Sequence, residues 1–230
     1  MEGLLIKKSL KIIIISLAMV FILVYIFYIA PEIVESKINK ANVFLCELRV
    51  EIEYRTEGKY DDSFIKLCEA CVDSNNVEKA IKYSPVFLDN KDLVYDGNDE
   101  DTSREETFDR IQSFYLLALL HSDKQSEFKN EFISRFSDFK TNEYKYYCFT
   151  EQKNSLNLSA ENREFFSDVL GEIYKSGDFM KDDETPILTL QMLLYKECGN
   201  TEKMKEAQDL LYIHISNNAG NFNIIEDVTN

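Results

Sequence analysis

The sequence predicts an all-α protein, in which one N-terminal transmembrane helix precedes a helical domain. Two observations predict the helices: the 230 residues include only 7 Gly and 3 Pro, and apolar residues recur three and four positions apart over long windows. A third observation predicts the membrane span, because residues 12–30 are almost wholly apolar and uncharged. We expect one acidic all-α domain over residues 31–216 and a flexible C-terminal tail over residues 217–230.

Residues 12–30 are long enough to remain in the bilayer. A helix of this length rises about 28 Å, close to the ~30 Å thickness of the hydrocarbon core. The competing interpretation is a cleaved secretory signal, because three lysines within residues 7–11 resemble its basic start. Signal cores usually run for about 7 to 15 residues, however, and the small-residue cleavage pattern is missing where Ala30 precedes Pro31. We therefore expect a retained signal-anchor that contacts the lipid bilayer.

The same lysines predict the orientation of the chain in the membrane. Cytoplasmic flanks of membrane spans carry the excess of Lys and Arg, and the lysines lie on the short N-terminal side. We expect residues 1–11 to form a short cytoplasmic N-terminus of a single-pass protein in the cell membrane, with the domain outside the cytoplasm. The alternative places the domain in the cytosol, because five cysteines leave one free thiol in any disulfide scheme.

The charge of the domain limits its partners. The chain carries a formal net charge of −15, and residues 1–31 contribute +2, so the remainder carries −17. We expect no binding to nucleic acid, because phosphate contacts depend on Lys and Arg. A protein or peptide partner with basic groups is compatible with this charge, and solubility is the other explanation of the acidity.

Residues 34–52 contain an apolar stripe at helical spacing. Its members are Val34, Ile38, Ala41, Leu45, Leu48 and Ile52. Residues 44–55 also alternate with period two, which predicts a strand. We favour the helix, because the remaining chain offers few partner strands. The stripe predicts either packing inside the domain or the seam of a homodimer, in which case the chain would be a structural dimerising membrane protein.

The later helices are better marked in the sequence. Four helix starts carry residues that usually cap a helix: Ser103 with Glu106, Ser159, Thr185 before Pro186, and Asn200. Residues 114–120, FYLLALL, are apolar all round. A helix of this kind has no face for water, so we expect it to be the central buried helix.

Cys68 and Cys71 lie three residues apart and allow several interpretations. On a helix they share an apolar face with Phe64, Leu67 and Val72, which predicts packing. A reactive thiolate needs a helix N-terminus or nearby cations, whereas these residues lie well inside their segment. A structural disulfide or a metal site would need further ligands, and the other candidates are scattered: Cys46, His121, Cys148, Cys198 and His214. We expect small buried side chains and assign no metal or cofactor site.

No catalytic motif is recognisable in the sequence, which contains no nucleophile elbow, phosphate-binding glycine loop or HExxH pattern. Residues 96–101 are acidic and suggest calcium, but they depart from the EF-hand spacing and predict a solvated loop. We assign no catalytic residue. The alternative is a hydrolase with a carboxylate-based site, which the convergence of a carboxylate with His121 or His214 would favour.

Three short stretches of the sequence resemble tetratricopeptide-type repeats, in which two antiparallel helices form each unit. They are the L-G-x-x-Y match at Leu170, Gly171 and Tyr174, the helix end and turn at Tyr195, Gly199 and Asn200, and the turn at Asn75 and Asn76 before the small residue Ala80. The tryptophan of the pattern is absent, and the turns near Asn75, Asp123 and Gly199 are 48 and 76 residues apart.

The resemblance implies a degenerate helical-repeat, α-solenoid-like domain over residues 43–216, for which an irregular helical bundle is the alternative fold. It also implies that a protein or peptide binds along a concave surface formed by the first helices. We therefore expect a membrane-anchored scaffold or adaptor module displayed outside the cytoplasm. Within it, Tyr115 and Tyr174 are assigned to packing.

Overall fold

The computed structural model describes residues 15–25, 40–57, 62–90, 102–136, 142–177 and 184–217. Within these ranges the regular secondary structure is helical, so the all-α prediction is confirmed. Residues 15–25 form a separate helix, and the helices of the domain are α3 (Lys40–Glu57), α4 (Asp62–Asp73), α5 (Val77–Asp89), α7 (Thr102–His121), α8 (Gln125–Arg135), α9 (Asn142–Ser155), α10 (Ala160–Ser176), α11 (Glu184–Cys198) and α12 (Thr201–Asn217).

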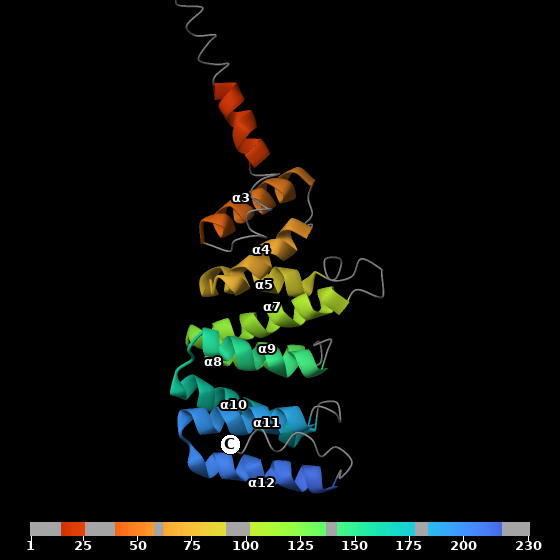
Figure 1. Ribbon diagram of the computed structural model, residues 1–230, viewed down its shortest axis with the longest axis vertical. Helices are drawn as coiled ribbons and strands as arrows, with labels where there is room; N and C mark the ends of the chain where they lie inside the picture. The colour runs from red at the N-terminus through yellow and green to blue at the C-terminus, as the bar shows by residue number, and fades with distance from the viewer. Residues whose placement is uncertain are drawn as a thin grey trace, which may run out of the picture.

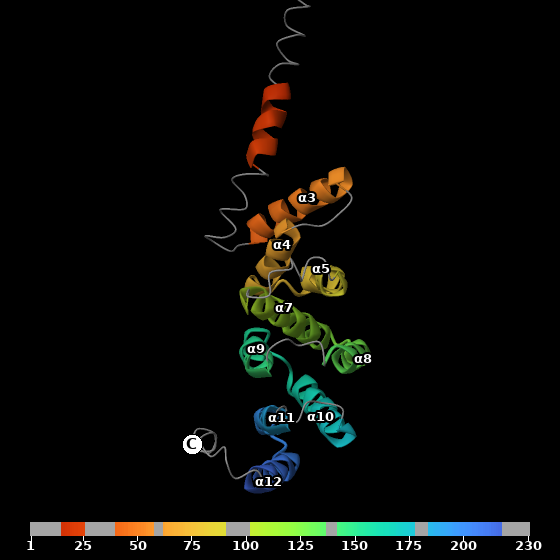
Figure 2. The ribbon, with the colours of Figure 1, turned by 90° about the vertical axis from the view of Figure 1, so that its right-hand side faces the viewer.

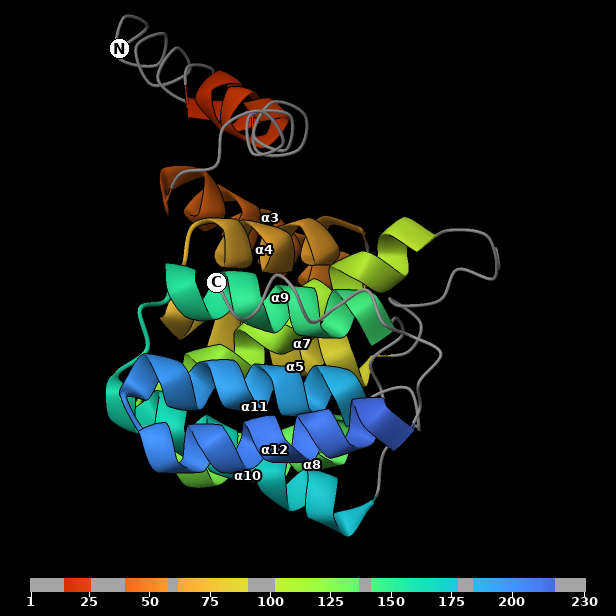
Figure 3. The same ribbon diagram turned by 60° about the horizontal axis from the view of Figure 1, so that its bottom comes forward.

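The helices of the domain stack along one long axis, from α3 at one end to α12 at the other (Figure 1). Helices that follow each other in the chain pack side by side from α3 to α8 and again from α10 to α12. In the middle of the stack α9 packs on α7 and α11, while α10 packs on α8, so α9 and α11 lie on one side and α8 and α10 on the other (Figure 2). Figure 3 shows α11 and α12 running side by side at the far end.

Four tight turns connect consecutive helices: α4 to α5, α7 to α8, α9 to α10, and α11 to α12. The helices on either side of the turn pack on each other in every case except α9 and α10. Each turn contains one residue with positive φ: Asn75 (52°), Asp123 (56°), Asn157 (50°) and Gly199 (82°). In every case the N–H of that residue donates a hydrogen bond to the carbonyl three residues earlier. In three turns the next N–H also donates to the carbonyl five residues earlier, which is the Schellman arrangement. Asn and Asp tolerate the left-handed conformation better than most residues, so the turns need glycine only once.

The helix at residues 44–55 is confirmed, because α3 covers this segment and the period-two alternation forms no strand. Two predicted caps are also confirmed. The Ser159 hydroxyl accepts a hydrogen bond from the N–H of Asn162 at 3.1 Å, and the Asn200 side chain accepts one from the N–H of Lys203 at 3.1 Å.

The other two predicted N-caps lie inside their helices, which begin two residues earlier than predicted. Helix α7 begins at Thr102, so Ser103 lies inside it, and α11 begins at Glu184, so Thr185 and Pro186 lie in its first turn. An acidic residue in a first turn is stabilised by the helix dipole, and Glu184 and Glu105 occupy such positions. This favourable position accounts for the earlier start of α11.

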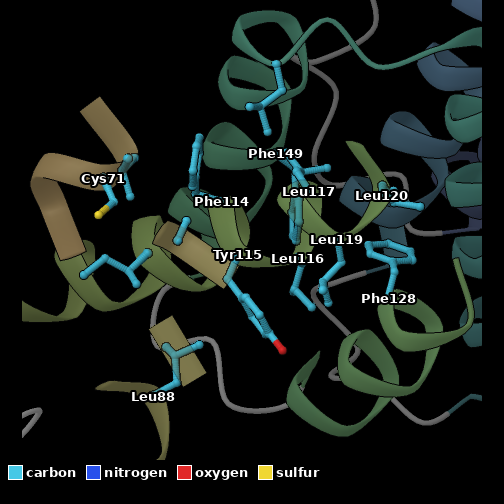
Figure 4. Packing of buried hydrophobic residues seen from close by; sticks show 14 of the residues in the cluster. Cys71, Leu88, Phe114, Tyr115, Leu116, Leu117, Leu119, Leu120, Phe128 and Phe149 are labelled. Carbon is cyan, nitrogen blue, oxygen red and sulfur yellow. The ribbon is translucent and has the colours of Figure 1, made fainter. Parts of the chain in front are cut away.

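The prediction that residues 114–120 form the central buried helix is confirmed. Every one of these side chains in α7 is at most 6% exposed (Figure 4). Helix α7 is enclosed because α4, α5, α8 and α9 all pack on it. One continuous apolar core therefore extends from Val43 in α3 to Leu194 in α11.

Phenylalanine rings fill the core where α8, α9 and α10 meet. Phe132 of α8 is at the centre of this group, with its ring centroid 5.2 Å from that of Phe128, 5.6 Å from that of Phe149 and 5.3 Å from that of Phe166. Aromatic pairs at these separations stabilise a core beyond the area that they bury. The rings thus join helices that the chain connects only through turns and loops.

The predicted membrane span is described only in part. Residues 15–25 are helical, and their large apolar side chains are 37% to 73% exposed. Among the helices that the structure describes, none combines the length and the apolar character that crossing a membrane requires. Residues 1–14 and 26–39 lie outside the described ranges, as do the acidic residues 96–101 and the predicted tail after Asn217.

We predict that Phe132→Ala destabilises the domain by about 3 to 5 kcal/mol, because it removes a fully buried ring and leaves a cavity between three helices. The neighbouring substitution Ile133→Ala is the matched control, since Ile133 is 49% exposed and should change stability by about 0.5 kcal/mol or less. Urea unfolding followed by circular dichroism measures both. Equal losses in the two variants would contradict the position of the core.

Candidate functional site

The cysteines that the sequence singles out are buried packing residues. Cys68 and Cys71 are 1% and 0% exposed in α4, and all five cysteines are free thiols, so no disulfide forms. Burial raises the pKa of the Cys71 and Cys148 thiols to about 12, which keeps them protonated and unreactive. Among the described residues, no group of three or more His, Cys, Asp or Glu side chains is arranged to hold a metal ion. The packing interpretation is confirmed for Cys68 and Cys71.

The two histidines lie in different parts of the stack. His121 is the last residue of α7 and is exposed. His214 of α12 contacts the carboxylate of Glu184, the first residue of α11. This contact joins two neighbouring helices at the end of the stack, and it brings together a histidine and a carboxylate, the pair that the hydrolase alternative needs in a pocket.

Buried polar side chains of the later helices bind the backbone of their neighbours. Asn162 of α10 is 3% exposed, and its amide nitrogen donates to the carbonyl of Leu120 at 2.7 Å and to the carboxylate of Asp123 at 3.2 Å. Its amide oxygen accepts a hydrogen bond from Gln125 at 3.0 Å. One side chain thus hydrogen-bonds a carbonyl in the last turn of α7 and fixes α10 against the turn between α7 and α8.

Charged side chains, one of them buried, are also paired between helices. The Lys153 ammonium, on a side chain that is 2% exposed, donates to Glu197 at 2.5 Å and so joins α9 to α11. Lys203 of α12 donates to Asp168 of α10 at 2.8 Å, and the Tyr195 hydroxyl donates to the same carboxylate at 2.6 Å. These groups hold the stack together.

A different arrangement lies on the side of α7 that faces α5 and α8. We call it the Tyr115 cluster, and it consists of Asp89, Gln112, Tyr115, Glu131 and Arg135. Arg135, near the end of α8, donates through Nη2 to Asp89 Oδ1 at 2.7 Å and through Nε to Glu131 Oε2 at 2.7 Å. The guanidinium therefore connects the ends of α8 and α5 across α7.

Two polar side chains of α7 in this cluster lack partners. Gln112 and Tyr115 lie one turn apart on one side of the helix. Gln112 is fully buried, and its Nε2 donates to the Arg135 carbonyl at 3.4 Å, but its Oε1 has no hydrogen-bond partner. Tyr115 is 6% exposed and points away from Phe114 and Phe149 (Figure 4), and no described group hydrogen-bonds to its hydroxyl. Buried polar atoms are nearly always paired, and among the described residues Gln112 Oε1 shares its lack of a partner with Ser84 Oγ, Arg163 Nε and Gln191 Oε1.

The electrostatics of the Tyr115 cluster favour a neutral tyrosine among carboxylates. Burial raises the pKa of Tyr115 to about 12, and the nearby Glu131 raises it further while Arg135 opposes the shift. Two carboxylates and one guanidinium leave the cluster with a net charge of −1. The sequence analysis assigned Tyr115 to packing, which holds for its ring. The signal that it missed is the polar pair Gln112 and Tyr115 on the side of an otherwise apolar helix.

Comparison with protein-family models, with curated proteins and with solved structures finds no match to this chain. The resemblance to tetratricopeptide-type repeats therefore stays a prediction. Its support comes from the residues and the helix arrangement of this chain alone.

We predict that Cys198 is the thiol that reacts first in the native protein. Cys198 is partly exposed, whereas the other four cysteines are buried. Labelling with N-ethylmaleimide, followed by peptide mass spectrometry, should modify Cys198 before urea is added and the other four only afterwards. The Cys198→Ser variant is the control and should show almost no native labelling. Native labelling of Cys68 or Cys71, or labelling that requires a chelator, would contradict their role in packing.

We predict that the domain loses stability between about pH 9 and pH 12. Burial raises the pKa of Tyr83, Tyr115 and Tyr195 from 10.0 to about 12, and that of Cys71 and Cys148 from 9.0 to about 12. The unfolded chain releases these protons first, so their contribution is complete below the unfolded pKa values and is lost as the pH rises through the folded ones. Urea unfolding at several pH values measures the effect. A free energy of unfolding that stays constant up to about pH 11 would contradict this account.

Proposed function

We propose that this protein is a membrane-anchored module that binds a protein or peptide through a degenerate helical-repeat domain displayed outside the cytoplasm. The observation that carries the proposal is the stack of helices in which similar positive-φ turns join three packed helix pairs, α4 with α5, α7 with α8, and α11 with α12, while a fourth positive-φ turn connects α9 to α10. Such a stack contacts mainly its neighbours and exposes long side surfaces, which suit extended partners. Scaffold and adaptor roles need no catalytic residue.

With the turn at Asn157 included, the spacing of the turns is more even than the spacing of the three turns recognised in the sequence, and this supports a helical repeat. The turn at Asn157 divides the interval from Asp123 to Gly199 into 34 and 42 residues. The helices that precede the four turns begin at residues 62, 102, 142 and 184, which are 40, 40 and 42 residues apart. Spacing of this kind is typical of helix-pair repeats with loops of different length.

The L-G-x-x-Y match has a packing role that does not depend on the family. Leu170, Gly171 and Tyr174 lie in α10, which follows the turn at Asn157, whereas the family pattern places these letters before the turn. Gly171 faces α11, and a Cβ atom at this position would lie 2.5 Å from Nε2 of Gln191. The glycine therefore permits the close approach of α10 and α11.

The surface that we propose for the partner differs from the one that the resemblance implies. First helices would line a concave surface, but residues 111–120 of α7 are buried and have no free face. The side formed by α5 and α8 is more accessible, since the carboxylate side chain of Asp89 is 66% exposed. Val86, one turn earlier on α5, is 38% exposed and adds apolar contact area next to it.

The anchor is proposed from residues 12–30 and their lysine flank. The described part is helical, and its exposed apolar side chains would be covered by lipid. A dimerising seam stays the alternative, because the residues that α3 buries in the core on which α4 packs are Val43, Cys46 and Val50, which are not the predicted seam residues. Helix α3 thus uses an apolar face inside the domain.

Protease treatment of intact cells tests the anchor and its orientation. We predict that the protein stays with the membranes in alkaline carbonate and that external protease removes the domain while leaving the N-terminus protected. Lys7→Glu, Lys8→Glu and Lys11→Glu combined should reverse the orientation of part of the population, because the positive flank is lost. A domain that is digested only after lysis would place it in the cytosol. A shortened chain in the medium would indicate a cleaved signal.

A further inference from the structure

We infer that the Tyr115 cluster binds a cationic side chain, a lysine or an arginine, of the protein or peptide partner. The inference rests on the proposed function and adds the chemistry by which the partner is recognised.

The unpaired atoms of the cluster are hydrogen-bond acceptors or can act as such. Arg135 uses Oδ1 of Asp89 and Oε2 of Glu131, so Asp89 Oδ2 and Glu131 Oε1 keep their lone pairs within the described contacts. Gln112 Oε1 is buried without a donor, and the Tyr115 hydroxyl has no described partner. Within the described contacts no donor is bonded to these four atoms, which favours a ligand that carries several N–H groups. Lysine ammonium has three such donors and arginine guanidinium has five.

An anionic ligand fits the cluster less well. Arg135 is the one cation of the cluster. The Nη2 and Nε atoms of Arg135 already donate to carboxylates, and the Arg135 side chain is 13% exposed. The Glu131 side chain is 34% exposed and that of Asp89 66% exposed, so a ligand that approaches from solvent meets carboxylates first. The charge of the rest of the domain acts in the same direction and raises the local concentration of cations.

The two α7 side chains separate this cluster from an ordinary surface ion pair. Exposed carboxylates on a strongly acidic protein attract cations without selectivity. Tyr115 is 94% removed from solvent, and its ring extends away from Phe114 and Phe149, on the side of α7 where Leu88 of α5 lies (Figure 4). A neutral hydroxyl at fixed geometry selects for a donor group rather than for charge alone.

A matched pair of peptides tests the inference. The probe is a fluorescein-labelled tetra-arginine peptide amide, and its control is the tetra-citrulline peptide, which keeps the urea N–H groups and loses the charge. Fluorescence anisotropy with the full chain in detergent micelles at about 0.15 M salt measures binding, because screening then suppresses long-range attraction. We expect the arginine peptide to bind at least about tenfold more tightly than the citrulline peptide, since hydrogen bonds to charged groups are the stronger ones.

Three substitutions place the binding at the cluster. Asp89→Asn and Glu131→Gln should each weaken binding of the arginine peptide about fivefold or more, and Tyr115→Phe about threefold or more. The controls are Glu172→Gln on α10, which removes one charge of a surface pair with Lys129, and Tyr212→Phe on α12, which removes an exposed hydroxyl. Both should change affinity less than twofold. Circular dichroism and the melting temperature show which variants remain folded, and Tyr115→Phe keeps the ring that packs in the core.

The outcomes separate the inference from the proposed function. Equal weakening by Glu172→Gln and by Glu131→Gln, or no effect of Tyr115→Phe, would reduce the cluster to general acidity and overturn the inference. The proposed function would survive that result if peptides selected from a random display library still bound the chain. If neither the arginine peptide nor any library peptide binds, both the inference and the proposed function fail.

Discussion

The enclosure of α7 by four other helices is the constraint on which the rest of the structure depends. Helices α4, α5, α8 and α9 pack around residues 111–120, and none of these ten side chains is more than 6% exposed. A helix of this kind cannot fold alone in water, because its apolar surface has no exposed direction. The hairpins before and after α7 must therefore assemble on it. The continuous core from α3 to α11 follows from that assembly.

Polar groups inside the stack fix the order in which its helices pack. Apolar burial alone would allow neighbouring helices to slide or exchange, since it has little directional preference. Asn162 prevents this at the α7 end, because it must reach the carbonyl of Leu120 and the side chain of Asp123. Lys153 acts in the same way between α9 and α11, since a buried ammonium without Glu197 would lose the compensation for its desolvation. The stack adopts the arrangement of helices in which each of these side chains reaches its hydrogen-bond partners.

Local chemistry predicts those features of this fold whose signal lies within a few residues. FYLLALL specifies a buried helix by composition, and Ser159 and Asn200 specify caps because a short polar side chain binds an N–H three residues later. The turn at Asn157 was missed, since Asn in the left-handed conformation has no sequence mark as plain as glycine. The Tyr115 cluster was missed for another reason: its residues come from three helices, and a single sequence does not show which helix ends meet. The even spacing of the helix pairs likewise became visible only when the turns were located.

The hydrogen bonds that each polar side chain already makes distinguish the side chains that hold the stack together from those that we assign to a partner. In α9 to α12 the buried amide of Asn162 and the ammonium of Lys153 find partners within the stack, because the helices that hold those partners pack directly on one another. On the α5 and α8 side, the two flanking helices both pack on α7, and Arg135 reaches across to Asp89. The guanidinium donates to the two carboxylates, and no described hydrogen bond from it reaches the Gln112 amide oxygen or the Tyr115 hydroxyl. These two groups lack a donor within the described contacts, and this is the basis on which we infer a partner that brings N–H groups and positive charge.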